Sequence, residues 1–135
     1  MYKRQLDHAV LKPEFSRADL AAHAAMCVAR GVGCICVRSC DVAAARDLVA
    51  GSPVVVASVI GFPHGAQRPE VKALESRHAI ADGARELDMV MNVGALKSGD
   101  EAAGRADTHF RIAYTVSERT LDRGIAALRR LAGGG

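Results

Sequence analysis

The chain has 135 residues, of which 50% are hydrophobic, 24% are charged and only 4% are aromatic, and its formal net charge is +3. This composition and length indicate one globular domain rather than a disordered chain, and scattered basic residues without aromatic platforms argue against a nucleic-acid surface. No apolar run approaches the roughly 20 residues of a membrane span, and the N-terminus lacks a signal-peptide core, so we expect a cytoplasmic protein that binds no membrane.

The first predicted elements are a helix and a strand. Ser16, followed by Asp19, resembles a capping box, and it begins an Ala-rich helix that ends at Gly31. The apolar residues 32–37 then predict a short strand.

The next stretch predicts a helix, a strand and a further helix. Asp41 is expected to cap a helix over residues 42–51. The uninterrupted β-branched run at residues 53–62 is typical of a strand that is buried on both faces. Residues 69–83 predict a third helix, which a glycine stops. Strands and helices that alternate at this spacing favour parallel βαβ units, in which functional groups gather where the strands end.

A third predicted strand carries an acid among apolar residues. In the stretch ELDMVMNVGALKSGD, which begins at residue 86, Asp88, Val90 and Asn92 would share one strand face. An unpaired carboxylate that loses its water becomes protonated or destabilises the fold, so we expect Asp88 to be ionised and wet, in a groove. A solvated acid at a strand end and a helix-capping acid are alternative interpretations.

Four cysteines lie within fourteen residues, at positions 27, 34, 36 and 40, without the paired spacing of a zinc site. Cys34 and Cys36 would share one face of a strand. We expect buried, reduced thiols rather than metal ligands or disulfides. Lys97 follows the last predicted strand, where it is a candidate phosphate ligand or a solvated loop lysine.

Three stretches resemble the deoxyribose-phosphate aldolase family: LDHAVLKP at 6–13, VIGFPHG at 59–65 and ADGARELDMVMNVGALKSGD at 81–100. Their order and spacing match the N-terminal part of that family over residues 5–100. The resemblance implies an α/β fold, a partial (β/α)8 TIM barrel of about three βα units, followed by a short C-terminal strand and helix. It divides the chain into a barrel-like part, residues 1–100, and a tail, residues 101–135.

The resemblance implies a lyase of deoxyribonucleotide catabolism. Such enzymes reversibly cleave 2-deoxyribose 5-phosphate to acetaldehyde and glyceraldehyde 3-phosphate through a lysine Schiff base, with neither metal nor cofactor. Asp88 matches the strand aspartate that assists proton transfer, Asp7 matches an acid that helps hold the lysine network, and Cys36 matches a strand cysteine near the substrate. Asp7 and His8 have a structural alternative, a turn or cap before the first helix.

The chain departs from the family at several positions. Ala9 stands where the family often has Thr, and Arg38 and Ser39 stand where it often has Asn-Pro or a similar pair. The Schiff-base lysine of the family lies on a later strand, in a motif that this sequence lacks. The four lysines that the chain does contain, none of which matches that nucleophile, are Lys3, Lys12, Lys72 and Lys97.

The tail follows a different pattern. Residues 109–133 resemble the C-terminal end of class I pyridoxal-phosphate aminotransferases, in which the counterpart of Arg111 would bind a substrate carboxylate. An unrelated amphipathic helix is the alternative interpretation.

Together these features predict a truncated or chimeric, inactive aldolase that recognises a small phosphorylated sugar or aldehyde. The alternative is a non-catalytic half-barrel. Its open strand edges and an apolar inward face of Val, Ile, Cys and Met would make it self-associate as a homo-oligomer or aggregate.

Overall fold

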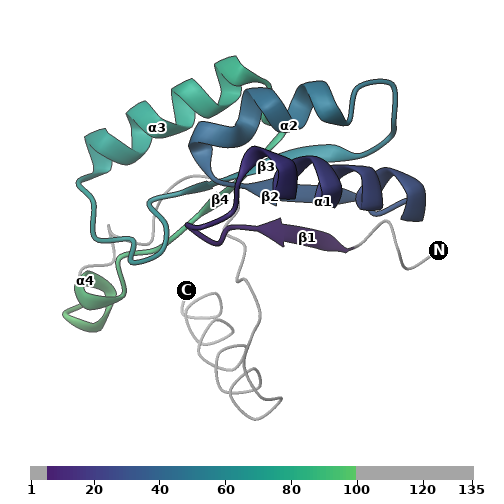
Figure 1. Ribbon diagram of the computed structural model, residues 1–135. Helices are drawn as coiled ribbons and strands as arrows, with labels where there is room; N and C mark the ends of the chain where they lie inside the picture. The colour runs from purple at the N-terminus through teal and green to yellow at the C-terminus, as the bar shows by residue number, and fades with distance from the viewer. Residues whose placement is uncertain (1–5, 100–135) are drawn as a thin grey trace, which may run out of the picture.

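Strands and helices alternate along residues 6–99, the part of the chain that the computed structural model describes (Figure 1). In chain order the elements are β1 (Asp7–Val10), α1 (Arg17–Arg30), β2 (Cys34–Val37), the 3-10 turn η2 (Ser39–Asp41), α2 (Val42–Leu48), β3 (Val55–Ile60), α3 (Pro69–Asp82), β4 (Glu86–Met89) and α4 (Val93–Lys97). The tail that the sequence separates from the barrel-like part, with Arg111, lies outside the described residues.

The four strands form one parallel sheet in the order β1-β2-β3-β4. Helices α1, α2 and α3 all cover the same face of this sheet (Figure 1). Three complete βα units are therefore followed by β4 and the short helix α4. The predicted parallel α/β architecture is confirmed.

Strand β1 corrects the sequence prediction, which placed three strands in this part of the chain. Asp7 pairs with Cys34 and His8 with Ile35, so both residues lie in a strand rather than in a turn or cap. The stretch is only four residues long and half of its residues are polar, so it lacks the apolar pattern from which a strand is predicted. Its backbone groups are satisfied by β2, beginning with the amide of Cys34, which donates to the carbonyl oxygen of Leu6 at 3.2 Å.

The helix boundaries follow their predicted caps in two helices out of three. The Ser16 hydroxyl accepts from the backbone amide of Asp19 at 3.3 Å, and the Asp19 carboxylate accepts from the amide of Ser16 at 2.8 Å, which confirms the capping box. Gly31 and Gly83 end α1 and α3 in left-handed conformations. The predicted cap of α2 is wrong, because the Asp41 carboxylate binds Arg38 at 2.6 Å instead.

The strand predicted to continue beyond Asp88 ends at Met89. The side-chain oxygen of Asn92 accepts from the amide of Ala95 at 3.1 Å, so Asn92 caps α4 and does not lie on a strand face. Leu87 and Met89 pack against the core beneath the helices, which turns Asp88 to the opposite face of the sheet.

The core has two parts, one on each face of the sheet. The larger part lies between the sheet and the helices, and Ile35, Val37 and Ile60 are its fully buried strand members. The smaller part lies on the opposite face, here called the inner face, and contains Cys34, Cys36, Ala57 and Val59, which are between 1% and 4% exposed. Burial of β3 on both faces is confirmed.

The inner face differs from the exposed apolar surface that the sequence suggested. Its Cys side chains and Val59 are buried and Val55 is partly buried. The isoleucines of β2 and β3, with Met89 of β4, point to the helix side instead. Strand alternation also places acids on the inner face, where Asp7 and Glu86 are exposed and Asp88 is partly buried. The face is therefore mixed in polarity, not uniformly apolar.

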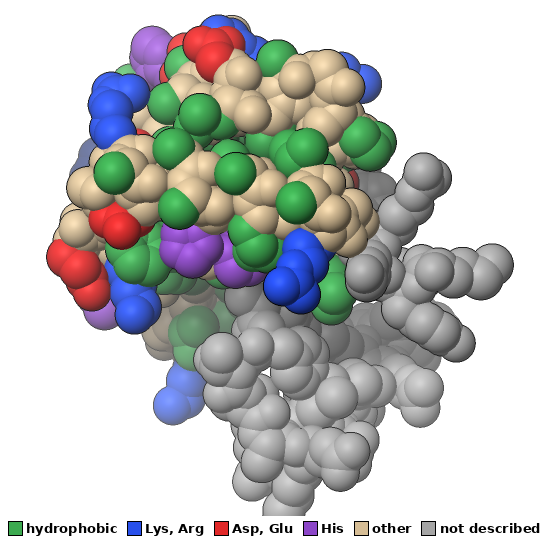
Figure 2. Space-filling model, turned by 45° about the vertical axis from the view of Figure 1, so that its right-hand side comes forward, with side chains coloured by type: hydrophobic (Ala, Val, Ile, Leu, Met, Phe, Trp, Pro, Cys, Tyr) green, Lys and Arg blue, Asp and Glu red, His purple; other side chains and the backbone are tan. Residues whose placement is uncertain are grey.

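Figure 2 shows one side of the surface, on which hydrophobic side chains are scattered among charged ones and histidine side chains gather. Two histidines that lie together are His8 of β1 and His23 of α1, whose ring nitrogens are 2.8 Å apart. Burial, and then the neighbouring His23, lower the pKa of His8. Across residues 6–99, no helix combines the length and the apolar character needed to cross a membrane.

Candidate active site

The inner face brings three of the four predicted site residues onto one surface. Asp7 is the first residue of β1, Cys36 lies in β2 and Asp88 lies in β4. In the sheet register Cys36 is aligned with Ala57, and Val59 of the same strand face is aligned with Asp88. Because strand side chains alternate, all of these residues point away from the helices.

Asp88 lies in an environment that disfavours its charge. It is partly buried, and this burial raises the pKa of its carboxyl group. The expectation of a wet carboxylate therefore holds only in part, because Asp88 keeps some exposure but loses part of its solvation. A carboxyl group with a raised pKa in a cleft is a candidate acid-base catalyst.

Cys36 is electrostatically coupled to the acids of β4. Burial raises the pKa of its thiol to about 12, and the negative charges of Asp88 and Glu86 add to that shift. The thiol is consequently protonated near neutral pH, so it can shape the site as a small, weakly polar side chain but is a poor nucleophile.

Asp7 lies in a second cluster that sequence reasoning missed. Asp7, Cys34 and Glu86 each place one potential ligand atom within 4.8 Å of the others. Burial, followed by the charge of Glu86, raises the pKa of the Cys34 thiol to about 12. Three ligands are the smallest set that holds zinc, but here a metal would have to displace a tightly held thiol proton. The i, i+2 spacing from Cys36 and Asp88 is the signal that could have identified Cys34 and Glu86.

Lys97 lies apart from these residues. It is in the last turn of α4, beyond the end of β4, and its side chain is exposed. Within the described part of the chain, no contact brings it to Asp88. Its role as a phosphate ligand stays a prediction.

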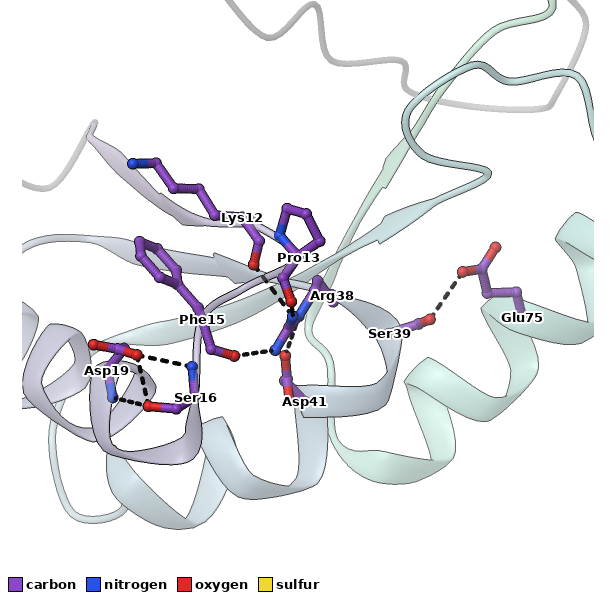
Figure 3. A network of polar contacts seen from close by, with 9 residues as sticks. All are labelled: Lys12, Pro13, Phe15, Ser16, Asp19, Arg38, Ser39, Asp41 and Glu75. Carbon is purple, nitrogen blue, oxygen red and sulfur yellow. Dashed lines mark hydrogen bonds and ion pairs between the residues drawn. The ribbon is translucent and has the colours of Figure 1, made fainter.

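Arg38 organises the loops where β1 and β2 end (Figure 3). Its guanidinium donates to the carbonyl oxygens of Lys12 at 3.2 Å, Pro13 at 3.0 Å and Phe15 at 3.1 Å, and to the carboxylate of Asp41 at 2.6 Å. A planar guanidinium suits such a fan of acceptors. Arg38 thus fixes the loop that follows β1.

Helix α3 continues these contacts to the ends of the next two strands. The Glu75 carboxylate accepts from the Ser39 hydroxyl at 2.9 Å and from the amide of Gly61 at 2.8 Å (Figure 3 shows the Ser39 contact). The Lys72 ammonium donates to the carbonyl oxygen of Val90 at 2.8 Å. We call the contacts of Arg38, Ser39, Glu75 and Lys72 the polar brace, because they link the C-terminal ends of all four strands.

The loop after β3 packs directly on the backbone that follows β4. Gly65 has φ +65°, and a Cβ atom at this position would lie only 2.2 Å from the carbonyl oxygen of Met91. Only glycine allows this conformation together with this approach. The sequence does not reveal this contact with the segment that follows the Asp88 strand.

A groove of about 410 Å3 lies between α3 and the turn η2, and Leu74 and His78 are among its lining residues. It opens on the helix side of the sheet. It is therefore separate from the inner face that carries Asp88.

Comparison with known proteins identifies close relatives. No protein-family model matches the chain. The chain is 46% identical over 97 residues to deoxyribose-phosphate aldolase 1 of Bacillus licheniformis, which covers 72% of this chain and 44% of the relative. It is 45% identical over 103 residues to deoxyribose-phosphate aldolase of Halobacterium salinarum, which covers 76% of this chain and 48% of the relative. The chain thus spans less than half the length of these relatives.

Solved structures give the same result. The aldolase QR15 superimposes with a TM-score of 0.70 at 34% identity, over 74% of this chain and 44% of that one. A tetrameric deoxyribose phosphate aldolase from Aeropyrum pernix superimposes with a TM-score of 0.65 at 23% identity, over 76% of this chain and 48% of that one, and shows the likeness of fold alone. Each match covers only part of the solved chain, as expected for a partial barrel.

The buried thiols should resist alkylation. Cys40 is exposed, whereas Cys27, Cys34 and Cys36 are buried, and burial raises the pKa of all three. With a pKa of about 12, only about one thiol in ten thousand is ionised at pH 8. Brief treatment of the native chain with iodoacetamide should therefore give one adduct, on Cys40, by mass spectrometry. Urea-unfolded chain should give four, and rapid native modification of Cys34 or Cys36 would contradict the buried inner face.

Substituting Asp88→Asn should stabilise the fold at neutral pH. Because burial raises the pKa of Asp88 in the folded chain, the ionised carboxylate favours the unfolded chain, and stability falls as pH rises through the folded pKa. The gain in melting temperature should be present at pH 7 and shrink below the ordinary carboxyl pKa of about 3.9, where both side chains are neutral. Glu14→Gln, at an exposed position, is the matched control. A gain of equal size at both pH values would rule out the electrostatic cause.

Proposed function

Because the chain belongs to the deoxyribose-phosphate aldolase family over the residues that it shares with these relatives, we propose that residues 6–99 form the proton-transfer half of an aldolase site. The reaction proposed is the reversible cleavage of 2-deoxyribose 5-phosphate to acetaldehyde and glyceraldehyde 3-phosphate. Asp88 is the proton-transfer residue, Cys36 lies on the same face, and Asp7 supports that face. The ligand is a small phosphorylated sugar or aldehyde, and neither metal nor cofactor takes part.

The observation that carries this proposal is the placement of Asp88. Its carboxyl group is partly buried on the inner face, which also carries the protonated thiol of Cys36 two strands away, and burial raises the pKa of Asp88. General acid-base catalysis is most efficient when the pKa of the catalyst lies near the working pH. The fold thus moves the Asp88 pKa in the direction that this role requires.

The proposed site lacks a lysine amine that could form the Schiff base. A Schiff base needs a lysine that is neutral when it attacks and that reaches the carbonyl carbon near the acid. Of the four lysines in the sequence, those at described positions lie in the loop after β1 and on α3 and α4, and none of them lies on a strand. We therefore propose that these 135 residues form no productive Schiff base by themselves.

The cytoplasm is the compartment that we propose. The four cysteines are free, and three of them are buried, which suits a reducing environment.

Borohydride trapping tests the missing amine. The purified chain is incubated with acetaldehyde and sodium borohydride and analysed by intact mass and peptide mapping. We expect no reductively ethylated lysine above the level of a urea-unfolded control. An adduct formed selectively on Lys72 or Lys97 in the folded chain would show that the chain supplies its own amine and would refute this part of the proposal.

A chimera tests the acid half of the site. Residues 6–99 replace the matching segment of the Bacillus licheniformis relative, which then supplies the remainder of the barrel. We expect the chimera to release acetaldehyde from 2-deoxyribose 5-phosphate, and Asp88→Asn to lower kcat by about 10² to 10⁴-fold, the usual share of general acid-base catalysis. Glu14→Gln should leave kcat unchanged. A chimera that keeps its kcat after Asp88→Asn would refute the role of Asp88.

The alternative function is a non-catalytic half-barrel that self-associates. It is favoured by the two outer strands, since β1 and β4 each have a single strand neighbour within the described sheet. Unpaired strand edges are templates for association with another chain. Short strands of four residues each limit the strength of such pairing.

Size-exclusion chromatography with light scattering tests this alternative. Association through strand edges predicts a mass that rises above 14.2 kDa with concentration and persists in high salt, because backbone hydrogen bonds are not screened. A mass of 14.2 kDa at every concentration would refute the self-associating half-barrel.

A further inference from the structure

Strand β4 lies at the edge of the described sheet. Strand β4 has four residues, and its described strand neighbour is β3 alone. Directly after the strand, the amide of Val90 donates to the carbonyl oxygen of Ile60 at 2.8 Å. The carbonyl oxygen of Val90 accepts from the Lys72 ammonium at 2.8 Å. Both backbone polar groups of Val90 are therefore bonded, only two residues beyond Asp88.

The Lys72 side chain is confined where it makes this contact. Its side chain is partly buried, and burial lowers the pKa of its ammonium group. Its alkyl chain fills the space beside Gly61, where a Cβ atom would lie 2.9 Å from Cε of Lys72. A lysine on the open surface would be fully solvated and free to move. The Lys72 side chain is partly desolvated and confined, so it has a defined position.

Glu75 lies one turn further along the same face of α3, at the i+3 position from Lys72. Its two carboxylate oxygens bind the hydroxyl of Ser39 and the amide of Gly61. One helix face thus holds the segments that follow β2, β3 and β4. A shift of α3 along the sheet would disturb all three together.

We propose that Lys72 and Glu75 are positioning residues that hold the C-terminal end of β4 against β3 and thereby set the depth and direction of Asp88 on the inner face. They act through the backbone of Val90 and Gly61 and do not contact substrate. The catalytic importance of the Asp88 position rests on the proposed function. The role of Lys72 and Glu75 in holding the end of β4 does not depend on it.

The first test measures Asp88 itself in the full 135-residue chain. The carboxyl group of Asp88 is titrated by carbon NMR in the unsubstituted chain and in Lys72→Met, Lys72→Arg and the control Arg77→Met, which changes an exposed cation on the same helix. Release of the strand end should expose Asp88, so Lys72→Met should lower its pKa towards the ordinary value. Lys72→Arg should retain the raised pKa, and Arg77→Met should not change it.

The direction of the shift separates positioning from simple charge loss. Removing a cation by itself would raise a nearby carboxyl pKa, whereas lost burial lowers it. A raised or unchanged Asp88 pKa in folded Lys72→Met would overturn the proposal.

Amide hydrogen exchange provides a second measurement that stability changes cannot imitate. In Lys72→Met and in Glu75→Leu, exchange at Val90 should accelerate by about tenfold or more relative to the amide of Val55, which donates to Gly33 at the opposite end of β3. Equal acceleration at both amides would indicate global destabilisation and would overturn a local brace.

The chimera described above connects the brace to catalysis. There Lys72→Met should lower kcat by about 10- to 100-fold with little change in KM, since small misplacements of a catalytic group cost rates of this order. If the chimera proves independent of Asp88 while the NMR shift occurs, the proposed function fails and the brace stands. If Asp88 is essential but Lys72→Met changes neither its pKa nor kcat, the brace fails alone.

Discussion

Parallel pairing of four short strands is the constraint on which the rest of this structure depends. The register of β2 with β3 and of β3 with β4 fixes which side chains share a face, because strand residues alternate strictly. Ile35 and Ile60 are thereby directed to the helices, and Cys36 and Asp88 to the inner face. A slip of one residue in β4 would turn Asp88 to the helix side of the sheet and Leu87 to the inner face, so packing and chemistry depend on the same hydrogen bonds.

The inner face combines burial with charge at a cost to stability. Asp88 loses part of its hydration, and its negative charge makes the neighbouring thiol of Cys36 still harder to ionise. Such unfavourable electrostatics are common where a group must be held ready for proton transfer. The large apolar layer between sheet and helices supplies the stability that tolerates it.

The strand ends show how a sheet becomes a platform for a site. Loops after parallel strands have backbone groups that no ladder satisfies. Here side chains satisfy them. Arg38 donates to carbonyl oxygens after β1, and Lys72 donates to the carbonyl oxygen of Val90 after β4. The Glu75 carboxylate accepts from the amide of Gly61 after β3. The ends of the strands are therefore fixed by side chains that come from other elements of the fold.

Local pattern alone determined much of this protein. Periodicity and capping predicted α1 and α3 and their glycine ends, the β-branched run predicted β3, and the i, i+2 rule placed Asp88 away from Leu87 and Met89. These features depend on neighbours within a few residues, which a sequence displays directly.

The tertiary structure decided the rest. Residues 7–10 form a strand because they pair with β2. Asp41 binds Arg38 instead of capping α2, and β4 ends at Met89. The tertiary structure also joined Cys34 with Asp7 and Glu86, and Lys72 with Val90. The Arg38–Asp41 contact is local. The pairing of β1, the Cys34 cluster and the Lys72–Val90 contact join residues between 18 and 79 positions apart, which meet only when the sheet has formed, and an isolated stretch of sequence carries no record of them.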